Sequence, residues 1–244
     1  MKAIVTGANG FVGSNLIKKL IGNGVGVLAV DVSFSNCRLP ESDLIEKKEI
    51  SIDGLGKITE EIKGKYELFY HFAWEGVNGE KKGDLNVQLN NVKNTLKCAE
   101  TAKKAGCRKF MCAGTIAERN VESLDNVKTA SAGTVYGISK YTARLMTAAY
   151  CKNAGLDFIW MQFSNIYGPD NKTGNLISYT LDRLLRGEEA FFGPAKQPYD
   201  FIFIDDLIEA VYRIGVKKTN ANFYFIGSGK PKILSDYLYK VGEI

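Results

Sequence analysis

The amino-acid sequence predicts an α/β fold, with a doubly wound parallel sheet and a smaller C-terminal region. Three observations lead to this class. Short apolar runs alternate with amphipathic stretches of helical spacing. The apolar runs are continuous, as expected for strands buried on both faces. A glycine-rich turn joins the first run to the first helix. With 244 residues, of which 45% are hydrophobic, the chain can bury a substantial core.

The elements of the first part alternate between strand and helix. Residues 2–6 (KAIVT) predict a buried strand, and residues 11–21 predict the helix that follows it. Later strands are expected at residues 25–30, 49–52, 68–72, 109–113 and 157–163. Long helices are expected at residues 84–105, where apolar side chains recur every three or four residues, and at residues 136–153. This alternation indicates βαβ units whose helices cover both faces of the sheet.

The character of the sequence changes after residue 164. The segment NIYGPDNKTGN that follows is rich in turn formers, and later strands are short. We therefore expect a main dinucleotide-binding domain at residues 1–164 and a smaller substrate-binding region at residues 165–244 that interleaves with it. The last helical segment lacks a stop signal, so we expect the natural chain to continue past Ile244.

Composition excludes several classes of function. The formal net charge is +5, but Lys and Arg are spread along the chain without the clusters of a nucleic-acid-binding surface. Five cysteines without a CxxC pair disfavour a disulfide framework or a zinc site and favour the reducing cytoplasm. No apolar run approaches the roughly 20 residues of a membrane span. His71 is the only histidine and is expected beside a cofactor at a strand end, without a metal.

The glycine-rich turn, TGANGFVG at residues 6–13, has the spacing GxxGxxG between a strand and a helix. Gly7 permits a tight turn, Gly10 lets the main chain approach a pyrophosphate, and Gly13 lets the helix pack closely on the sheet. The free N–H groups and the dipole at the helix start favour phosphate. The turn therefore predicts a dinucleotide site that also includes Asn9, Phe11 and Val12.

Residues at the ends of the next strands indicate which dinucleotide is bound. Asp31 follows the turn by about 20 residues, where a carboxylate accepts hydrogen bonds from a ribose diol and repels a 2′-phosphate. This position favours NAD over NADP, but Arg38 is near enough in sequence to leave NADP as the alternative. Ile52 and Asp53 are expected near the adenine, and the other interpretation of Asp53 is a turn residue.

A tyrosine and a lysine in the segment YGISK, Tyr136 and Lys140, share one helix face. We expect the ammonium group to lower the pKa of Tyr136, which then exchanges a proton with a sugar hydroxyl while hydride moves to or from nicotinamide. Lys140 also suits the nicotinamide ribose. The expected partner hydroxyl is Thr115, at the carboxyl edge of the sheet. Looser candidates for that hydroxyl are Thr129, Ser131 and Thr134.

These motifs resemble the extended short-chain dehydrogenase/reductases of the NAD-dependent epimerase/dehydratase family, which modify nucleotide sugars. The similarity covers essentially the whole chain and includes HFAW at 71–74, NVKNTLKCAE at 91–100, SNIYGPD at 164–170 and YDFIFIDDLIEA at 199–210. The resemblance implies a Rossmann-type sheet and bound NAD flanked by Phe72, Ala73 and Asn91. For a sugar nucleotide it implies contacts with Trp74, Thr115, Asn165, Leu176 and Tyr199.

Departures from the family pattern bear on the reaction and on charge. Family dehydratases carry Thr-Asp-Glu at the catalytic hydroxyl, whereas this chain has Thr115, Ile116 and Ala117, so dehydration is not expected. Gln162 and Tyr199 stand where the family has arginines. Candidates for the missing positive charge are Lys172, Arg183, Arg186 and Lys196.

The sequence leaves three functions open. The first, which we expect, is an NAD-dependent nucleotide-sugar epimerase that oxidises the sugar transiently at C4 and recycles its cofactor. The second is an NAD(P)H-dependent nucleotide-sugar 4-ketoreductase that uses the same residues and exchanges its cofactor. The third is a non-catalytic dinucleotide-binding protein. The resemblance also implies a homodimer formed through the two long helices.

Overall fold

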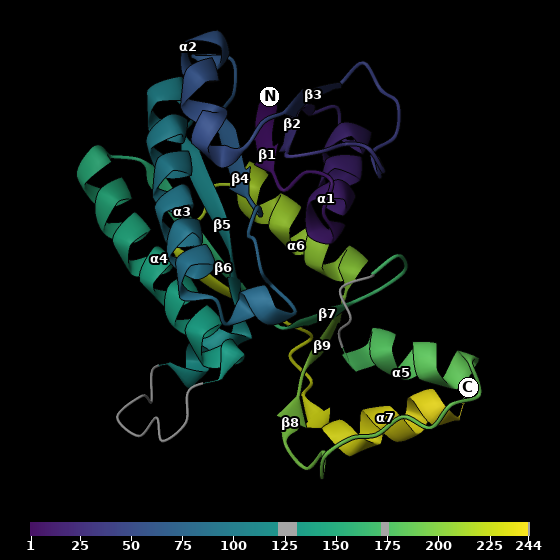
Figure 1. Cartoon of the computed structure of the whole chain (residues 1–244). Coiled ribbons are helices and arrows are strands. Elements are labelled where there is room, and N and C mark those ends of the chain that lie inside the picture. Colours follow the sequence, from purple (N-terminus) through teal and green to yellow (C-terminus); the bar gives the residue numbers. More distant parts are fainter. Residues whose placement is uncertain (122–130, 172–175, 244) are drawn as a thin grey trace.

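The computed structural model describes residues 1–121, 131–171 and 176–243, and the centre of this part of the chain is a seven-stranded sheet (Figure 1). Its order is β10-β6-β5-β4-β1-β2-β3, and every neighbouring pair is parallel. The strands are β1 (Lys2–Thr6), β2 (Gly26–Asp31), β3 (Ile45–Glu49), β4 (Leu68–His71), β5 (Lys109–Thr115), β6 (Asp157–Phe163) and β10 (Phe223–Ile226). The direction of strand order reverses between β1 and β4, and ligands bind beyond the carboxyl ends at such a point. The predicted doubly wound sheet is confirmed.

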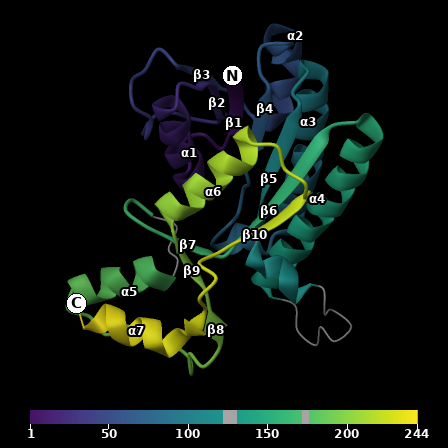
Figure 2. The same cartoon turned by 180° about the vertical axis from the view of Figure 1, so that it is seen from behind.

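Helices cover both faces of this sheet (Figures 1 and 2). α1 (Phe11–Gly22) and α6 (Ile204–Val216) lie on one face, and α3 (Leu85–Ala105) and α4 (Ala132–Ala154) lie on the other. Successive strand residues point to opposite faces. Ala3 and Val5 therefore join the buried cluster of α1 and α6, whereas Ile4 joins the cluster of α3 and α4. Burial on both faces explains the continuous apolar runs of the sequence.

Side-chain caps set where the two long helices begin. Asp84 Oδ1 accepts hydrogen bonds from the N–H groups of Asn86 at 2.8 Å and Val87 at 3.1 Å, so α3 begins where the sequence predicted it. Ser131 and Thr134 form a capping box, and α4 therefore begins at Ala132, one turn before the predicted start. The sequence pattern concealed this box because threonine takes the place of the usual glutamate or glutamine.

The third strand was predicted wrongly at residues 49–52. β3 ends at Glu49, and the chain continues as the 3₁₀ helix η1 (Ile52–Ile58) and the short helix α2 (Thr59–Ile62). β3 is the edge of the sheet, and its sequence IEKKE is half exposed. Edge strands commonly carry lysines that discourage pairing with other chains. A charged edge strand does not produce the apolar run by which the inner strands were found.

A smaller part lies beyond the carboxyl edge of the sheet (Figure 1). It contains β7 (Asn165–Tyr167) paired with β9 (Phe201–Phe203), β8 (Pro198–Tyr199) paired with β11 (Lys232–Ile233), α5 (Leu176–Leu185) and α7 (Leu234–Gly242). Between β9 and β11 the chain returns to the main sheet as α6 and β10. The division of the chain after residue 164 into two interleaved parts stays a prediction. None of the helices in the described ranges is long and apolar enough to cross a membrane.

Candidate active site

A cavity of about 1070 Å³ lies at the carboxyl ends of the central strands. It extends from the glycine-rich turn after β1, past the ends of β4 and β5, to the smaller part of the chain. All the residues predicted to bind the cofactor line this cavity. The predicted substrate residues Trp74, Asn165, Leu176 and Tyr199 line it as well. The tertiary structure thus brings segments from both ends of the chain to one site.

The glycine-rich turn leaves no space for side chains. A Cβ atom on Gly13 would lie 2.1 Å from the Gly7 carbonyl oxygen, and one on Gly7 would lie 2.7 Å from the Ala73 nitrogen. Gly7 also has a φ of +69°, in the left-handed region that glycine adopts readily. α1 begins after Gly10 without a side-chain cap and without an acidic residue in its first turn. Its free N–H groups and dipole therefore fit a pyrophosphate.

Asp31 is held at the end of β2 by main-chain donors. Its Oδ2 accepts from the Asn9 N–H and its Oδ1 from the Val32 N–H, each at 2.8 Å. The Asn9 side chain accepts from the Arg38 N–H at 2.9 Å, which ties the turn to the loop after β2. The Arg38 guanidinium donates to the Asp170 carbonyl at 3.4 Å and does not line the cavity. Asp31 therefore lies in the cavity wall, and among the described residues no Lys or Arg lines the cavity beside it to bind a 2′-phosphate.

Asp53 lines the same end of the cavity next to Ile52. Its carboxylate forms an ion pair with Lys97 of α3, and that hydrogen bond lowers the pKa of Asp53. The side chain therefore has a partner within the protein. Contact with adenine stays a prediction for both residues.

Tyr136 and Lys140 lie on neighbouring turns of α4, and both line the cavity. Lys140 Nζ donates to the Ala113 carbonyl at 2.9 Å and lies 3.7 Å from the centre of the Trp74 ring. The Trp74 and Tyr136 rings meet edge to face, with their centres 6.2 Å apart. The expected lowering of the tyrosine pKa is wrong for this structure. Burial raises the pKa of Tyr136, and the ammonium group is directed at Ala113 and Trp74 instead of the phenol oxygen.

Thr115 ends β5 and caps the 3₁₀ helix η3 (Ile116–Asn120) through a hydrogen bond from the Ala117 N–H to its Oγ1 at 3.3 Å. Its side chain interacts with Tyr136 and opposes the rise in the pKa of the phenol. Thr115 itself does not line the cavity. Of the other candidates, Ser131 and Thr134 cap α4 by bonding to each other, and Thr129 lies outside the described residues. Thr115 is therefore the hydroxyl placed beside Tyr136.

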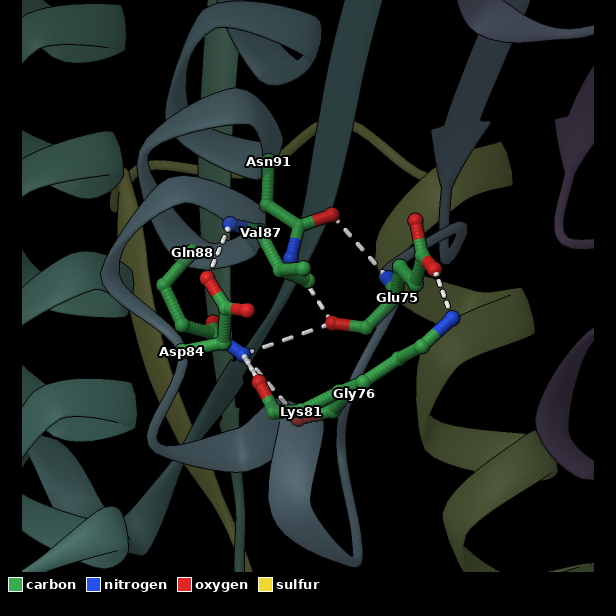
Figure 3. Close-up of polar contacts among 7 residues, drawn as sticks. All are labelled: Glu75, Gly76, Lys81, Asp84, Val87, Gln88 and Asn91. Carbon is green, nitrogen blue, oxygen red and sulfur yellow. Dashed lines mark hydrogen bonds and ion pairs between the residues drawn. The ribbon is translucent and has the colours of Figure 1, made fainter.

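Two amide side chains of α3 hold the loop that carries Trp74 (Figure 3). Gln88 is fully buried, and its Nε2 donates to the Gly76 and Lys81 carbonyls, each at 3.0 Å. Its Oε1 accepts from the Trp74 indole N–H at 2.9 Å. Asn91 accepts from the N–H of Glu75 and donates to its carbonyl, at 3.0 and 2.7 Å. The role of Gln88 was not predicted from the sequence, although its spacing from Asn91 places both amides on one helix face.

The substrate side of the cavity is built from side chains of the smaller part. Asn165 Nδ2 donates to the Asp200 carbonyl at 3.0 Å, so its oxygen remains available to a ligand. Asp200 is buried and accepts from the Ser228 N–H at 3.0 Å. Further polar residues that line the cavity were not predicted from the sequence, namely Asn90 and Asn94 of α3 and Ser164. Ser164 directly follows β6 and could have been found by extending the strand-end argument.

The candidates for the missing positive charge that the structure describes do not line the cavity. Arg183 pairs with Glu188 at 2.8 Å, and Arg186 pairs with Asp182 at 2.9 Å. Neither they nor Lys196 line the cavity, and Lys172 lies outside the described residues. The structure therefore assigns no cation from this group to a substrate phosphate.

His71 ends β4 as a buried, neutral side chain. Its Nδ1 shares a hydrogen bond with Thr6 Oγ1 at 2.7 Å, and its Nε2 shares one with Thr95 Oγ1 at 3.2 Å. Burial, aided by the charge of Lys140, lowers the pKa of His71 to about 3. No cluster of three metal-ligating His, Cys, Asp or Glu side chains occurs among the described residues.

The chain is similar to known proteins over most of its length. The family model described as "NAD dependent epimerase/dehydratase family" matches residues 3–227. A putative UDP-glucose 4-epimerase of Methanocaldococcus jannaschii is 26% identical, over 93% of this chain and 77% of its own length. The dTDP-6-deoxy-L-talose 4-dehydrogenase (NAD(+)) of Aggregatibacter actinomycetemcomitans is 26% identical, over 96% of this chain and 87% of its own length.

Solved structures show the same fold. The UDP-glucuronic acid 4-epimerase of Bacillus cereus, solved in complex with NAD, has a TM-score of 0.83 at 22% identity and covers 100% of this chain and 85% of that chain. Curated relatives also include decarboxylases and a dehydratase, so the family comprises enzymes of several activities on nucleotide sugars. NAD is the cofactor of the family, as the glycine turn and Asp31 predicted. The chain belongs to the NAD-dependent epimerase/dehydratase family.

Proposed function

We propose that the protein is an NAD-dependent nucleotide-sugar epimerase that acts by transient oxidation at the sugar C4. The observation that carries this proposal is that Tyr136 and Lys140 line the cavity that begins at the glycine turn, with the Thr115 side chain against Tyr136. The similarity to a putative UDP-glucose 4-epimerase over 93% of the chain supports it.

Each residue of the site has a role in this proposal. NAD held along the glycine-rich turn would supply the acceptor for hydride from C4 of the sugar and the donor for its return. Tyr136, as the phenolate, takes the proton of the C4 hydroxyl, and Thr115 holds that oxygen by a hydrogen bond. Because burial raises the pKa of Tyr136, the phenolate needs stabilising partners. The Thr115 side chain opposes this rise, and the Lys140 ammonium would add positive charge once it turns from the Ala113 carbonyl toward the phenol oxygen. Lys140 also donates hydrogen bonds to the ribose next to the nicotinamide.

A 4-ketoreductase is the second candidate, and the similarity to a dTDP-6-deoxy-L-talose 4-dehydrogenase favours it. The same three residues would then protonate a keto sugar after hydride arrives from NADH or NADPH. Dehydration is disfavoured because Ile116 and Ala117 offer no acid or base next to Thr115. A non-catalytic dinucleotide-binding protein would not need the Tyr136 and Lys140 pair.

Retention of the cofactor separates these candidates. Purified protein is denatured to release and measure bound NAD, and native protein is incubated with UDP-, dTDP-, GDP- and CDP-sugars without added cofactor. Conversion to a C4 epimer under these conditions is the expected result. A requirement for stoichiometric NADH or NADPH would replace the epimerase by the reductase. No conversion and no cofactor consumption with any sugar would contradict both.

We also propose that the protein acts as a cytoplasmic homodimer. The outer surfaces of α3 and α4 expose apolar side chains, namely Leu85, Leu89, Leu145 and Met146. These two helices lie side by side (Figures 1 and 2), so that two copies would form a four-helix interface. All five cysteines are free thiols, which supports a reducing compartment. Sedimentation at micromolar concentration tests the dimer, and a pure monomer would contradict it.

A further inference from the structure

A buried carboxylate close to the site has no part in the mechanism above. Glu118 lies in η3, and its side chain is fully buried. Its Oε1 accepts a hydrogen bond from the Thr115 N–H at 2.6 Å. The indole N–H of Trp160 in β6 donates to both carboxylate oxygens, at 3.1 and 2.9 Å. Burying a carboxylate costs several kcal/mol unless positive charge and hydrogen bonds compensate it.

The opposite charge is supplied by α4. Lys140 is also buried, with its Nζ on the Ala113 carbonyl, and Arg144 Nη1 lies 4.0 Å from Glu118 Oε2. Burial lowers the pKa of Lys140, and the charge of Glu118 opposes that effect. Lys140 and Arg144 in turn oppose the rise that burial causes in the pKa of Glu118. The two buried charges thus act at one strand end, where Lys140 holds Ala113 and Glu118 holds Thr115.

We propose that Glu118 is a positioning residue of this site, because its carboxylate is the fixed counter-charge of the Lys140 ammonium and holds Thr115 in place beside Tyr136. Glu118 does not line the cavity and therefore acts through Lys140 and Thr115. The role of Glu118 in the reaction rests on the proposed function. Its effect on Lys140 can be measured through NAD binding alone, which is a property of the family.

The other groups around Lys140 do not provide this negative charge. His71 of β4 is neutral because burial lowers its pKa, and Cys112 of β5 is a neutral thiol because burial raises its pKa. Tyr136 of α4 is a neutral phenol in this structure for the same reason. Arg144 is positive, and Trp160 does not ionise. Among the described residues, Glu118 is therefore the carboxylate whose negative charge acts on Lys140.

The substitution E118Q tests the charge separately from the hydrogen bonds. A glutamine oxygen can still accept from the Thr115 N–H and the Trp160 indole, but it carries no charge. NAD affinity is measured by calorimetry from about pH 6 to about pH 10 in the wild type, in E118Q and in E100Q. Glu100 is an exposed residue of α3 and serves as the matched control. Thermal unfolding shows whether each variant is folded.

NAD affinity should fall as pH rises through the pKa of Lys140, because the neutral amine no longer favours binding. In E118Q the midpoint of this pH dependence of NAD affinity should lie about one pH unit lower, because the charge that raises the pKa of Lys140 is gone. E100Q should follow the wild type. A merely structural role would change the unfolding temperature and leave the midpoint in place. An unmoved midpoint in folded E118Q overturns the proposal.

E118D completes the test by keeping the charge while shortening the side chain. Its NAD midpoint should stay close to that of the wild type, whereas turnover should fall more than KM changes, because Thr115 loses its anchor. If E118Q does not fold, a midpoint in E118D displaced by about one unit overturns the role of the charge. The NAD titrations need no sugar substrate. Failure of the proposed reaction would therefore appear in the sugar panel and not in these measurements.

Discussion

The two sides of the cavity are built from different parts of the chain. The cofactor side consists mainly of main chain and glycines at the ends of β1, β2 and β4, joined by side chains such as Asp31 and Lys140, and it lies between two large buried clusters. The substrate side consists of side chains on two-stranded sheets and α5, around a small buried cluster of Ala195, Phe201 and Leu234. The cofactor side is therefore fixed by backbone geometry, and the substrate side by side chains that can vary on a lightly packed support.

The largest expected effect concerns the chemistry at the boundary of the two sides. Tyr136→Phe should lower kcat/KM by about 1000-fold, because it removes the proton acceptor, and should leave NAD affinity nearly unchanged. Steady-state kinetics and NAD titration measure both quantities. Tyr141→Phe makes the same chemical change on α4 away from the cavity and should be silent. Full activity of Tyr136→Phe would remove Tyr136 from the mechanism.

Gly13→Ala tests whether backbone geometry determines the cofactor side. The new Cβ would lie 2.1 Å from the Gly7 carbonyl oxygen, so the turn must move. We expect a loss of about 3 kcal/mol in the free energy of unfolding, together with loss of detectable NAD binding. Urea unfolding and NAD titration provide the measurements.

Gly22→Ala is the matched control at the other end of α1, because nothing lies within 4 Å of a Cβ atom there. It should raise stability by up to about 1 kcal/mol. If Gly13→Ala and Gly22→Ala had the same free energy of unfolding and the same NAD affinity, the close packing of the glycine-rich turn would not determine NAD binding.

The pH dependence of the free energy of unfolding should come largely from His71, which ends β4 on the cofactor side. Burial lowers the pKa of His71 from its usual 6.5 to about 3. The unfolded chain therefore takes up a proton that the folded chain does not, so the stability is complete above about pH 6.5 and is lost as pH falls toward 3. The loss should be about 1.4 kcal/mol per pH unit. Urea unfolding at several pH values in the wild type and in His71→Gln measures it, and an equally steep loss in the variant would contradict this assignment.

The smallest effect is expected on the substrate side. Asn165→Ala should raise the KM of the sugar nucleotide by about fivefold, through loss of a hydrogen bond worth about 1 kcal/mol, without changing NAD affinity. Asn23→Ala, at an exposed position after α1, is the control. A loss of NAD affinity in Asn165→Ala would contradict this prediction, because a residue of the substrate side would then also affect cofactor binding.

Local patterns predicted most of the main domain and the cofactor side. The inner strands appeared as apolar runs because they are buried on both faces, and β6 was predicted with its observed bounds. β3 was misplaced because an edge strand carries charge. The glycine spacing could be interpreted because each glycine meets a local steric demand. The substrate side offered no such pattern, since its lining residues come from short strands with few neighbours of their own.

The sequence by itself determined the doubly wound sheet, the phosphate turn and the Tyr136–Lys140 pair, because each depends on local spacing and on burial that repeats along the chain. Only the tertiary structure decided that Glu118 is buried against Thr115 and Trp160, that Gln88 holds Trp74, and that burial raises the pKa of Tyr136. These depend on the distances between charges and on their removal from water, which are set when segments far apart in the chain pack together.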